Sequence, residues 1–421
     1  MTTDNLNSFL LPLDAARQAH LASLELASKK GHDRDRALKA MAETLKRYAN
    51  DVLEANTLDL EASREMAVPD LVLEWLKLTP ERIQAAVQIL NRLSELGDPI
   101  RRAMNASYHL EHSQIYSQLM PLGVIALVYE AFPQLGAIAA GLCIKSGNCL
   151  ILKGGSESYH TNKAIVECLQ AGLEQGGLPV ECVQLLPADQ GGSIRDLVTL
   201  EQYVNLVIPY GRPSLVQQVM RQATAPVLKS AMGNCYLYWS PTGSLDLARF
   251  VIFDSHQSEP DPVNAIEKVL IHRTQKPTSM SMLFNSLKEK GFVVKGDADL
   301  VADFPGLVEA KDGEWNQAYL TKTVAFKVVD SLEEGIGWIN DYSSGHADCI
   351  VTESYQESRQ FALGINSAST FINASPRFYR QPKQADTIFL GMSNQKGHRR
   401  GVIGLETLTT VKHIVQGNGV F

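Results

Sequence analysis

Residues 121–156 read PLGVIALVYEAFPQLGAIAAGLCIKSGNCLILKGGS, and the other segments can be placed by working outward from them. Val124 to Tyr129 form a short apolar run that is rich in strand-forming residues. After Pro133, apolar residues recur at helical spacing on one face until Ser146-Gly147-Asn148, where a glycine can take a left-handed cap. A second apolar run, Cys149 to Leu152, follows. The stretch therefore predicts a βαβ unit in which one helix joins two buried parallel strands.

The carboxyl ends of these two strands are the candidate ligand-binding positions, because ligands of parallel sheets bind there. A lysine at such an end can reach a ribose or its 2′-phosphate, and glycines let backbone amides approach a phosphate closely. An ordinary turn with a solvated lysine is the alternative. The candidate nucleotide-binding residues are Glu130 and Pro133 after the first strand, and Lys153, Gly154, Gly155 and Ser156 after the second.

The composition limits the class of protein. With 421 residues, 45% hydrophobic and 20% charged, the chain is long enough for two or three globular domains. A formal net charge of -7 argues against nucleic acids and acidic membranes as partners. The six cysteines show no CxxC pair, no secretory signal precedes the first helix, and no apolar run has membrane-spanning length. We therefore expect a cytoplasmic protein with reduced cysteines and a small-molecule ligand.

The N-terminal part predicts helices and the rest predicts alternating strands and helices. Residues 11–66 favour continuous helix, residues 71–96 favour helix broken at Thr79-Pro80, and residues 108–120 favour an exposed strand pair. Such alternation is typical of doubly wound α/β lobes. We predict two of them with a cleft between them: a nucleotide-binding lobe at 11–231, completed by 365–421, and a second lobe at 232–364. The other predicted strands lie at 182–186, 204–208, 235–239, 268–272, 320–329, 349–352, 388–390 and 411–415, and the other predicted helices at 164–173, 194–200, 214–222 and 245–253.

Several short motifs occur in the order found in one known family. They include MGNCYLY at 232–238, NAIE at 264–267, VVDSLEE at 328–334, SGH at 344–346, NAS at 373–375, QK at 395–396 and GLE at 404–406. In these motifs and in residues 121–156 the chain resembles gamma-glutamyl phosphate reductase, within the aldehyde dehydrogenase superfamily. The resemblance implies the aldehyde dehydrogenase-like fold with a small oligomerisation element near 108–120, a homo-oligomer, and NADPH-dependent conversion of L-glutamyl 5-phosphate to glutamate 5-semialdehyde in proline biosynthesis.

The resemblance also implies a cysteine nucleophile, which this chain lacks. In such reductases a thiolate attacks the acyl phosphate, phosphate leaves, and hydride reduces the resulting thioester. The family pattern around the cysteine reads approximately Arg-Pro-Gly-Val-Cys-Asn-Ala-Met-Glu. The corresponding stretch here is EPDPVNAIE, residues 259–267, which places Val263 at the nucleophile position, next to Asn264. No cysteine lies between Cys235 and Cys349, so a shift of register restores none.

Other departures from the family fall near the same expected site. Glu259 replaces an arginine, which reverses a charge where the substrate is anionic. Phe132 also stands at an arginine position, residues 210–212 (YGR) replace Arg-Gly-Gly, and residues 380–386 replace a glycine- and glutamate-containing loop. Cys235 and Cys349 are expected in the core, and Ser255 and Ser258 are expected to be loop residues that face water. His346 and His398 have no cluster at ligand spacing, so no metal site is expected.

Two functional hypotheses remain open at this stage. The chain is either a reductase that uses a nucleophile the sequence does not identify, or a non-catalytic protein that keeps the fold and binds a dinucleotide or a partner. Asp189 to Ser193, DQGGS, is either a further phosphate-binding helix start or a plain helix cap.

Overall fold

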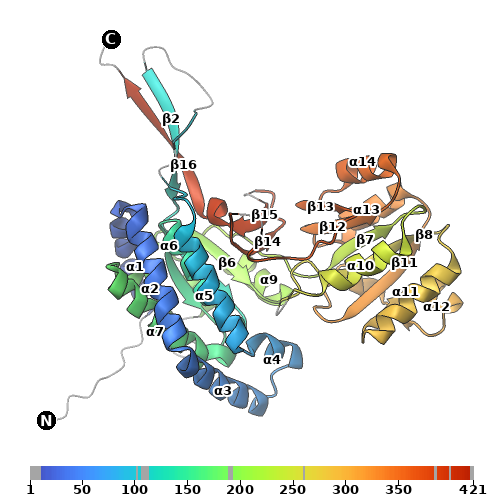
Figure 1. Ribbon diagram of the computed structural model, residues 1–421, viewed down its shortest axis with the longest axis horizontal. Coiled ribbons are helices and arrows are strands. Elements are labelled where there is room, and N and C mark those ends of the chain that lie inside the picture. The colour runs from blue at the N-terminus through green and yellow to red at the C-terminus, as the bar shows by residue number, and fades with distance from the viewer. Residues whose placement is uncertain are drawn as a thin grey trace. The chain divides into compact units, whose positions relative to one another are not determined.

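The computed structural model describes residues 11–100, 103–105, 113–187, 193–258, 261–383, 386–397 and 400–417. The chain divides into two compact units (Figure 1). The first unit comprises Met1–Lys229, Arg380–Leu390 and Ile403–Phe421, and the second comprises Ser230–Tyr379 and Gly391–Val402. The predicted assignment of all of 365–421 to the first lobe therefore differs from this division, since 365–379 and 391–402 belong to the second unit.

The N-terminal helices of the first unit are shorter than predicted. In place of one helix at 11–66 there are three: α1 (Pro12–Ser28), α2 (Gly31–Arg47) and α3 (Ala49–Glu65). The backbone is extended at Lys29, which ends the first of them. Helix propensity is high throughout residues 11–66. The chain nevertheless changes direction between the helices, and each helix packs its own apolar face against the sheet or a neighbouring helix. The predicted break at Thr79-Pro80 is confirmed, and it separates α4 (Asp70–Leu76) from α5 (Pro80–Glu95).

The central βαβ unit is confirmed. It consists of β3 (Val124–Tyr129), α6 (Pro133–Lys145) and β4 (Cys149–Lys153). Gly147 has φ +77°, as the predicted left-handed cap requires. The prediction that α6 is apolar on one face was too narrow, because all its residues are buried.

The sheet of the first unit has four parallel strands in the order β5-β4-β3-β6, where β5 is Val183–Leu185 and β6 is Leu206–Tyr210. Its other helices are α7 (Tyr159–Gly176), α8 (Ile194–Val198) and α9 (Pro213–Gln222). Helices α2, α5 and α7 pack on α6. This covering layer explains why a helix next to the sheet has no exposed side.

A three-stranded antiparallel sheet projects from the first unit (Figure 1). It contains β1 (Ala103–Asn105), β2 (Ser113–Pro121) and β16 (Thr409–Gly417). β2 pairs along its whole length with the tail strand β16, from Ser113 opposite Gly417 to Pro121 opposite Thr409. Of the strand pair predicted at 108–120, only β2 lies among the described residues, and its partners come from other segments.

The second unit contains a seven-stranded parallel sheet in the order β10-β9-β11-β8-β7-β12-β13. β7 (Cys235–Trp239) and β8 (Ile266–His272) lie at its centre, and the outer strands are β9 (Val293–Gly296), β10 (Val308–Glu309), β11 (Thr323–Val329), β12 (Ala347–Val351) and β13 (Ser369–Ile372). The helices are α10 (Leu245–Ser255), α11 (Pro277–Glu289), α12 (Ala298–Asp303), α13 (Leu332–Tyr342) and α14 (Tyr355–Gly364). Two further strands, β14 (Phe389–Ser393) and β15 (Gly401–Gly404), pair with each other.

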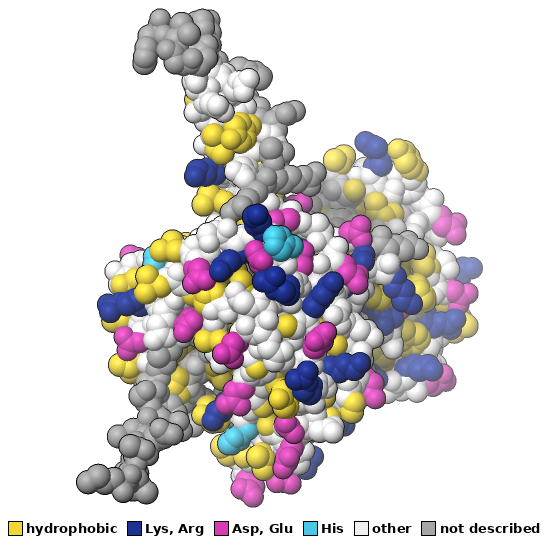
Figure 2. Space-filling view, turned by 60° about the vertical axis from the view of Figure 1, so that its left-hand side comes forward, with side chains coloured by type: hydrophobic (Ala, Val, Ile, Leu, Met, Phe, Trp, Pro, Cys, Tyr) yellow, Lys and Arg dark blue, Asp and Glu magenta, His cyan; other side chains and the backbone are white. Residues whose placement is uncertain are grey.

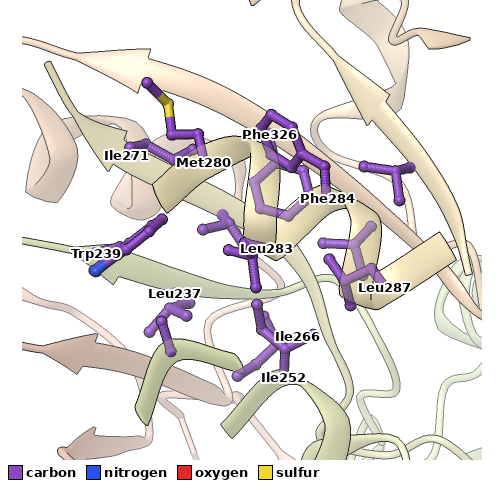
Figure 3. Packing of buried hydrophobic residues seen from close by; sticks show 14 of the residues in the cluster. Leu237, Trp239, Ile252, Ile266, Ile271, Met280, Leu283, Phe284, Leu287 and Phe326 are labelled. Carbon is purple, nitrogen blue, oxygen red and sulfur yellow. The ribbon is translucent and has the colours of Figure 1, made fainter. Parts of the chain in front are cut away.

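The core of the second unit packs α11 against its sheet (Figure 3). Phe284 of α11 meets Phe326 of β11 at a ring distance of 4.8 Å, and Leu283 is fully buried beside them. Leu237 and Ile266, from the two central strands, belong to the same cluster. This packing fixes β7 and β8, the two central strands of the sheet.

No described helix meets the length and hydropathy that crossing a bilayer requires. On the face shown in Figure 2, acidic and basic side chains are interspersed. That distribution agrees with the small negative net charge of the chain.

Candidate functional site

The first candidate region lies at the carboxyl edge of the four-stranded sheet. The chain passes from β3 to β4 and β5 on one side, and then returns to β6 on the other side of β3. Such a reversal of strand order creates the crevice in which doubly wound sheets bind ligands. The residues at this point are Glu130 and Ala131 after β3, and Gly211 and Arg212 after β6.

Glu130 and Arg212 form an ion pair at this point. The Nη2 of Arg212 lies 2.9 Å from a Glu130 oxygen, and the Arg212 backbone N–H also donates to the carboxylate at 2.8 Å. The hydrogen bond to Glu130 raises the pKa of Arg212. Gly211 is required here, since it has φ +151° and a Cβ on it would lie 2.7 Å from Glu130 Oε2. The sequence analysis missed the role of Arg212, although it lies four residues past the predicted strand at 204–208.

Phe132 and Pro133 are structural residues. The ring of Phe132 is buried, stacks on Trp75 at 4.6 Å and meets Tyr210 edge-on at 5.6 Å. Pro133 is buried at the first position of α6, where it loses no helical hydrogen bond. The aromatic cluster explains a phenylalanine at the position where the family has arginine.

Lys153, Gly154 and Gly155 are constrained by neighbouring groups of the same chain. Lys153 is 6% exposed, and its ammonium donates a hydrogen bond to the Pro187 carbonyl. A Cβ on Gly154 would lie 2.2 Å from Asn162 Nδ2, and one on Gly155 would meet the Glu157 carboxylate at 2.1 Å. A side chain at either position would therefore displace the Asn162 amide or the Glu157 carboxylate.

The fit of this edge to a dinucleotide is partial. Lys153 and Arg212 supply two cations, but each is held by an acceptor of the chain. The Ser156 side chain is exposed and can donate to a ribose or phosphate oxygen. Burial raises the pKa of Glu157, whose carboxylate accepts from the Ala131 N–H. A nucleotide phosphate at this edge would have to replace the Pro187 carbonyl as the acceptor of the Lys153 ammonium.

The motif at 189–193 ends in a helix cap. The Asp196 N–H donates to the Ser193 hydroxyl, and the Ser193 N–H donates to the Asp196 carboxylate. Residues 188–192 lie outside the described part of the chain. These two hydrogen bonds explain a serine at position 193 as a helix cap, without a bound phosphate.

The second candidate region is the segment before β8 that contains Val263. The Val263 side chain is fully buried, and its carbonyl accepts hydrogen bonds from the Gly233 N–H at 3.0 Å and from His346 Nε2 at 2.7 Å. Asn264 is also buried, and its Nδ2 donates to the Pro376 carbonyl at 2.8 Å. Glu259 lies outside the described residues. Val263, which the resemblance aligns with the nucleophile of the family, is therefore an apolar side chain in a tightly hydrogen-bonded segment.

Neighbouring hydroxyl groups do not supply a substitute nucleophile. The Ser255 hydroxyl is buried at the end of α10, where it donates to Ile252 O and accepts from the Ile266 N–H. The expectation that Ser255 faces water was wrong, because this hydroxyl joins α10 to β8. The Ser258 hydroxyl donates to Phe378 O at 3.0 Å.

The thiols are equally unsuited to attack. Cys235 Sγ lies 3.4 Å from His346 Nε2, but burial raises the pKa of Cys235 well above its ordinary value. The pKa of Cys349 is raised for the same reason. His346 is a poor base, because its Nε2–H donates a hydrogen bond to the Val263 carbonyl and burial lowers its pKa to about 4. Both cysteines lie in the core, as predicted.

A buried carboxylate holds the loops next to this segment. Glu267 accepts from three backbone N–H groups, those of Asn234 at 2.9 Å, Tyr319 at 2.8 Å and Leu320 at 2.7 Å. Burial raises its pKa. The Lys268 ammonium lies 3.6 Å above the Tyr319 ring, and desolvation lowers the pKa of Lys268 to about 8. The sequence analysis noted Glu267 only as part of a motif.

Within the described residues, no group of three or more His, Cys, Asp or Glu side chains could hold a metal ion. His398 lies outside them.

Comparison with known proteins shows the family to which the chain belongs. Residues 13–233 match the model of the aldehyde dehydrogenase family. Gamma-glutamyl phosphate reductase 2 of Synechocystis sp. is 54% identical over 419 residues, which is 99% of each chain. The chain belongs to the aldehyde dehydrogenase family and, within it, to the gamma-glutamyl phosphate reductases. The reductase of Gloeobacter violaceus is 38% identical over 96% of each chain.

The fold agrees with this family. The crystal structure of gamma-glutamyl phosphate reductase from Thermotoga maritima matches with a TM-score of 0.89 at 30% identity, covering 97% of this chain and 99% of that one. The predicted aldehyde dehydrogenase-like α/β fold is therefore confirmed.

Buried histidines in this family member should make its stability depend on pH. Burial lowers the pKa of His256 and His346 from 6.5 to about 4. Between these pH values the two side chains are protonated in the unfolded chain and neutral in the folded chain. Their contribution is complete above pH 6.5 and is lost as the pH falls towards 4. Asp348 acts oppositely, since burial raises its pKa from 3.8 to about 6. Together they should lower the free energy of unfolding by about 2 kcal/mol between pH 7 and pH 5.

Urea denaturation at both pH values measures this difference. His346→Asn should reduce it to below about 1 kcal/mol, whereas the control His32→Asn, at an exposed position, should leave it unchanged. Equal or greater stability at pH 5 would contradict the assignment of these groups.

Proposed function

We propose that this chain is a gamma-glutamyl phosphate reductase homologue in which the covalent step of the reaction has been lost. The observation that carries the proposal is the buried Val263 at the position where the family has its nucleophile. An isopropyl group cannot form the thioester that hydride would reduce. All six cysteines of the chain are buried, so none of them replaces the missing thiol.

The role that remains is binding rather than turnover. We propose weak binding of NADPH at the carboxyl edge of β3 and β4, with Lys153 and Ser156 as contacts and Glu130 holding Arg212. Glu130, Pro133, Gly154 and Gly155 shape the turns. When bound, NADPH would supply hydride; the chain's own residues would only position it. The family further supports a cytoplasmic homo-oligomer in proline biosynthesis, with the β1-β2-β16 sheet as its contact element.

A reductase with a different nucleophile is the alternative. No described hydroxyl or thiol near Val263 has an activating base, which favours the non-catalytic role. The deciding experiment is steady-state oxidation of glutamate 5-semialdehyde by the wild-type protein with NADP⁺ and phosphate. We expect no turnover above the uncatalysed rate. A turnover of about 1 per second, ordinary for an enzyme, would refute the proposal.

Lys153→Ala should weaken NADPH binding by about 1–3 kcal/mol, because a charged hydrogen bond to a phosphate oxygen would be lost. Calorimetric titration of the full chain measures this. Lys163→Ala is the matched control, since Lys163 is an exposed lysine of the same unit. The absence of any NADPH binding at millimolar concentration in the wild type would remove this part of the proposal.

A further inference from the structure

Helix α1 exposes an apolar stripe at the surface of the first unit. Its buried face packs against the strands β3, β4 and β5. On its other side Leu13, Leu21 and Leu24 are 41%, 60% and 61% exposed. Arg17 continues the stripe between Leu13 and Leu21, because residues three or four positions apart lie on one face of a helix. The stripe extends over about 16 Å of the helix, which is long enough to contact a second helix.

Neighbouring helices of the same unit have polar outer faces. On α2 and α5, both of which the structure describes in full, no large hydrophobic side chain is exposed, and the outer positions carry residues such as Lys39, Glu43 and Gln88. Single exposed leucines are common on soluble proteins, whereas a continuous apolar row marks a contact surface. Helix α1 therefore differs from its neighbours in presenting a surface that a partner would cover.

The charges beside the stripe favour a second copy of this chain as that partner. Arg17 has no ion-pair partner among the described residues, and Glu25 pairs with Lys29 while its side chain stays 53% exposed. Arg17 and Glu25 lie four residues before and four residues after Leu21. If two α1 helices pack antiparallel about a twofold axis at Leu21, Arg17 of each copy faces Glu25 of the other, so the ion pair forms twice.

An anionic membrane suits the stripe less well. Helix α1 carries two acidic residues, Asp14 and Glu25, against the single basic residue Arg17. Helices that lie on anionic membranes carry a basic excess beside their apolar face. The charges of α1 therefore oppose such a surface.

We propose that α1 binds α1 of a second copy of this chain, in an antiparallel pair with its twofold axis at Leu21. Leu21 and Leu24 of both copies form the apolar centre of the contact, and the two ion pairs between Arg17 and Glu25 form its rim. Leu13 packs on the methylene groups of Lys29 in the other copy. An apolar centre with a charged rim is the usual organisation of a protein interface.

One pair of helices buries less surface than a standard interface, so we expect association in the micromolar range. The contact is separate from the sheet of β1, β2 and β16, and it requires neither dinucleotide binding nor a catalytic nucleophile.

Leu21→Cys tests the position of the axis, because the two new thiols would meet across it. The full chain is treated with diamide, which takes up the two thiol hydrogens as the disulfide forms, and is then analysed by non-reducing electrophoresis. The six native cysteines are buried and give no background. Leu58→Cys is the control, since Leu58 is a 51% exposed leucine of α3 in the same unit. We expect a covalent dimer from Leu21→Cys, formed at least about tenfold faster than from Leu58→Cys.

Exchange of the charges tests the register by sedimentation velocity. Arg17→Glu and Glu25→Arg should each weaken association about tenfold, because like charges would then face each other. The double variant should return to within about threefold of the wild type, since both ion pairs form again with their charges exchanged. Leu21→Asp should weaken association about a hundredfold or more, because a carboxylate from each copy would be buried at the axis. Thermal unfolding of each variant shows that it is folded.

Oligomers assembled through the sheet of β1, β2 and β16 alone would give no cross-link at residue 21 and would not respond to these substitutions. That result would overturn the proposal, as would equal cross-linking of Leu21→Cys and Leu58→Cys or a double variant no better than the single ones. Binding of the wild type to phosphatidylglycerol vesicles, lost in Leu21→Asp and without a residue-21 cross-link, would assign the stripe to a membrane and would also overturn it.

Discussion

Val263→Cys should recover little reductase activity by itself, and Val263→Cys combined with Glu259→Arg should exceed either single variant. Loss of a covalent nucleophile lowers turnover on the order of a million-fold, or roughly 8 kcal/mol of barrier. Restoring the sulfur does not restore a thiolate, because the side chain at 263 is fully buried and burial already raises the pKa of nearby Cys235. A glutamate at 259 would also raise the thiol pKa and repel an anionic acyl phosphate.

The measurement is oxidation of glutamate 5-semialdehyde with NADP⁺ and phosphate by the wild type, both single variants and the double variant. Mass spectrometry after exposure to the aldehyde and NADP⁺ should detect an acyl-enzyme only in the two variants that carry the Val263→Cys substitution. Val263→Ser is the control for the change in size and polarity. Activity restored fully by Val263→Cys alone would show that the rest of the site is intact and that Glu259 has no effect.

The secondary-structure elements that could be predicted from the sequence are those whose hydrophobic pattern reflects the burial of their own residues. Val124 to Tyr129 and Cys149 to Lys153 are apolar at almost every position, as a strand covered on both faces must be, and both strands were confirmed. Residues 11–66 were predicted wrongly as one helix, because the backbone is extended at Lys29 and Lys30, just before Gly31, and leaves the helical conformation again at Tyr48.

The candidate site was less predictable, because its contacts join segments far apart in the chain. The partner of Glu130 is Arg212, and the loops that Glu267 holds begin at Asn234 and Tyr319. Ser255 looked like a loop residue, yet its hydroxyl bonds a strand eleven residues away. Val263 was identified only from the resemblance, since nothing in a buried valine indicates that another family member needs a thiol there.

Glu267→Ala should lower the free energy of unfolding of the second unit by about 3–5 kcal/mol. Three backbone N–H groups would lose their acceptor together, and each unpaired buried donor costs about 1–3 kcal/mol. The loss is smaller than the full sum, because the raised pKa of Glu267 shows that burying its charge is already unfavourable. Two of the loops involved are also strained: Asn234 has φ +53° and Leu320 has φ +58°.

Urea denaturation followed by tryptophan fluorescence reports this unit, which contains Trp239, Trp315 and Trp338, three of the four tryptophans of the chain. Glu309→Ala, an exposed glutamate of the same unit, is the control and should change the free energy by less than about 0.5 kcal/mol. The change in the free energy of unfolding for Glu267→Gln should lie between those of Glu267→Ala and Glu309→Ala. The glutamine amide oxygen keeps one acceptor, while its NH₂ group faces a backbone N–H donor. A change below about 1 kcal/mol for Glu267→Ala would mean that water replaces the carboxylate. A large change would instead show that this buried group, and not the sheet alone, positions the loop that bonds Val263.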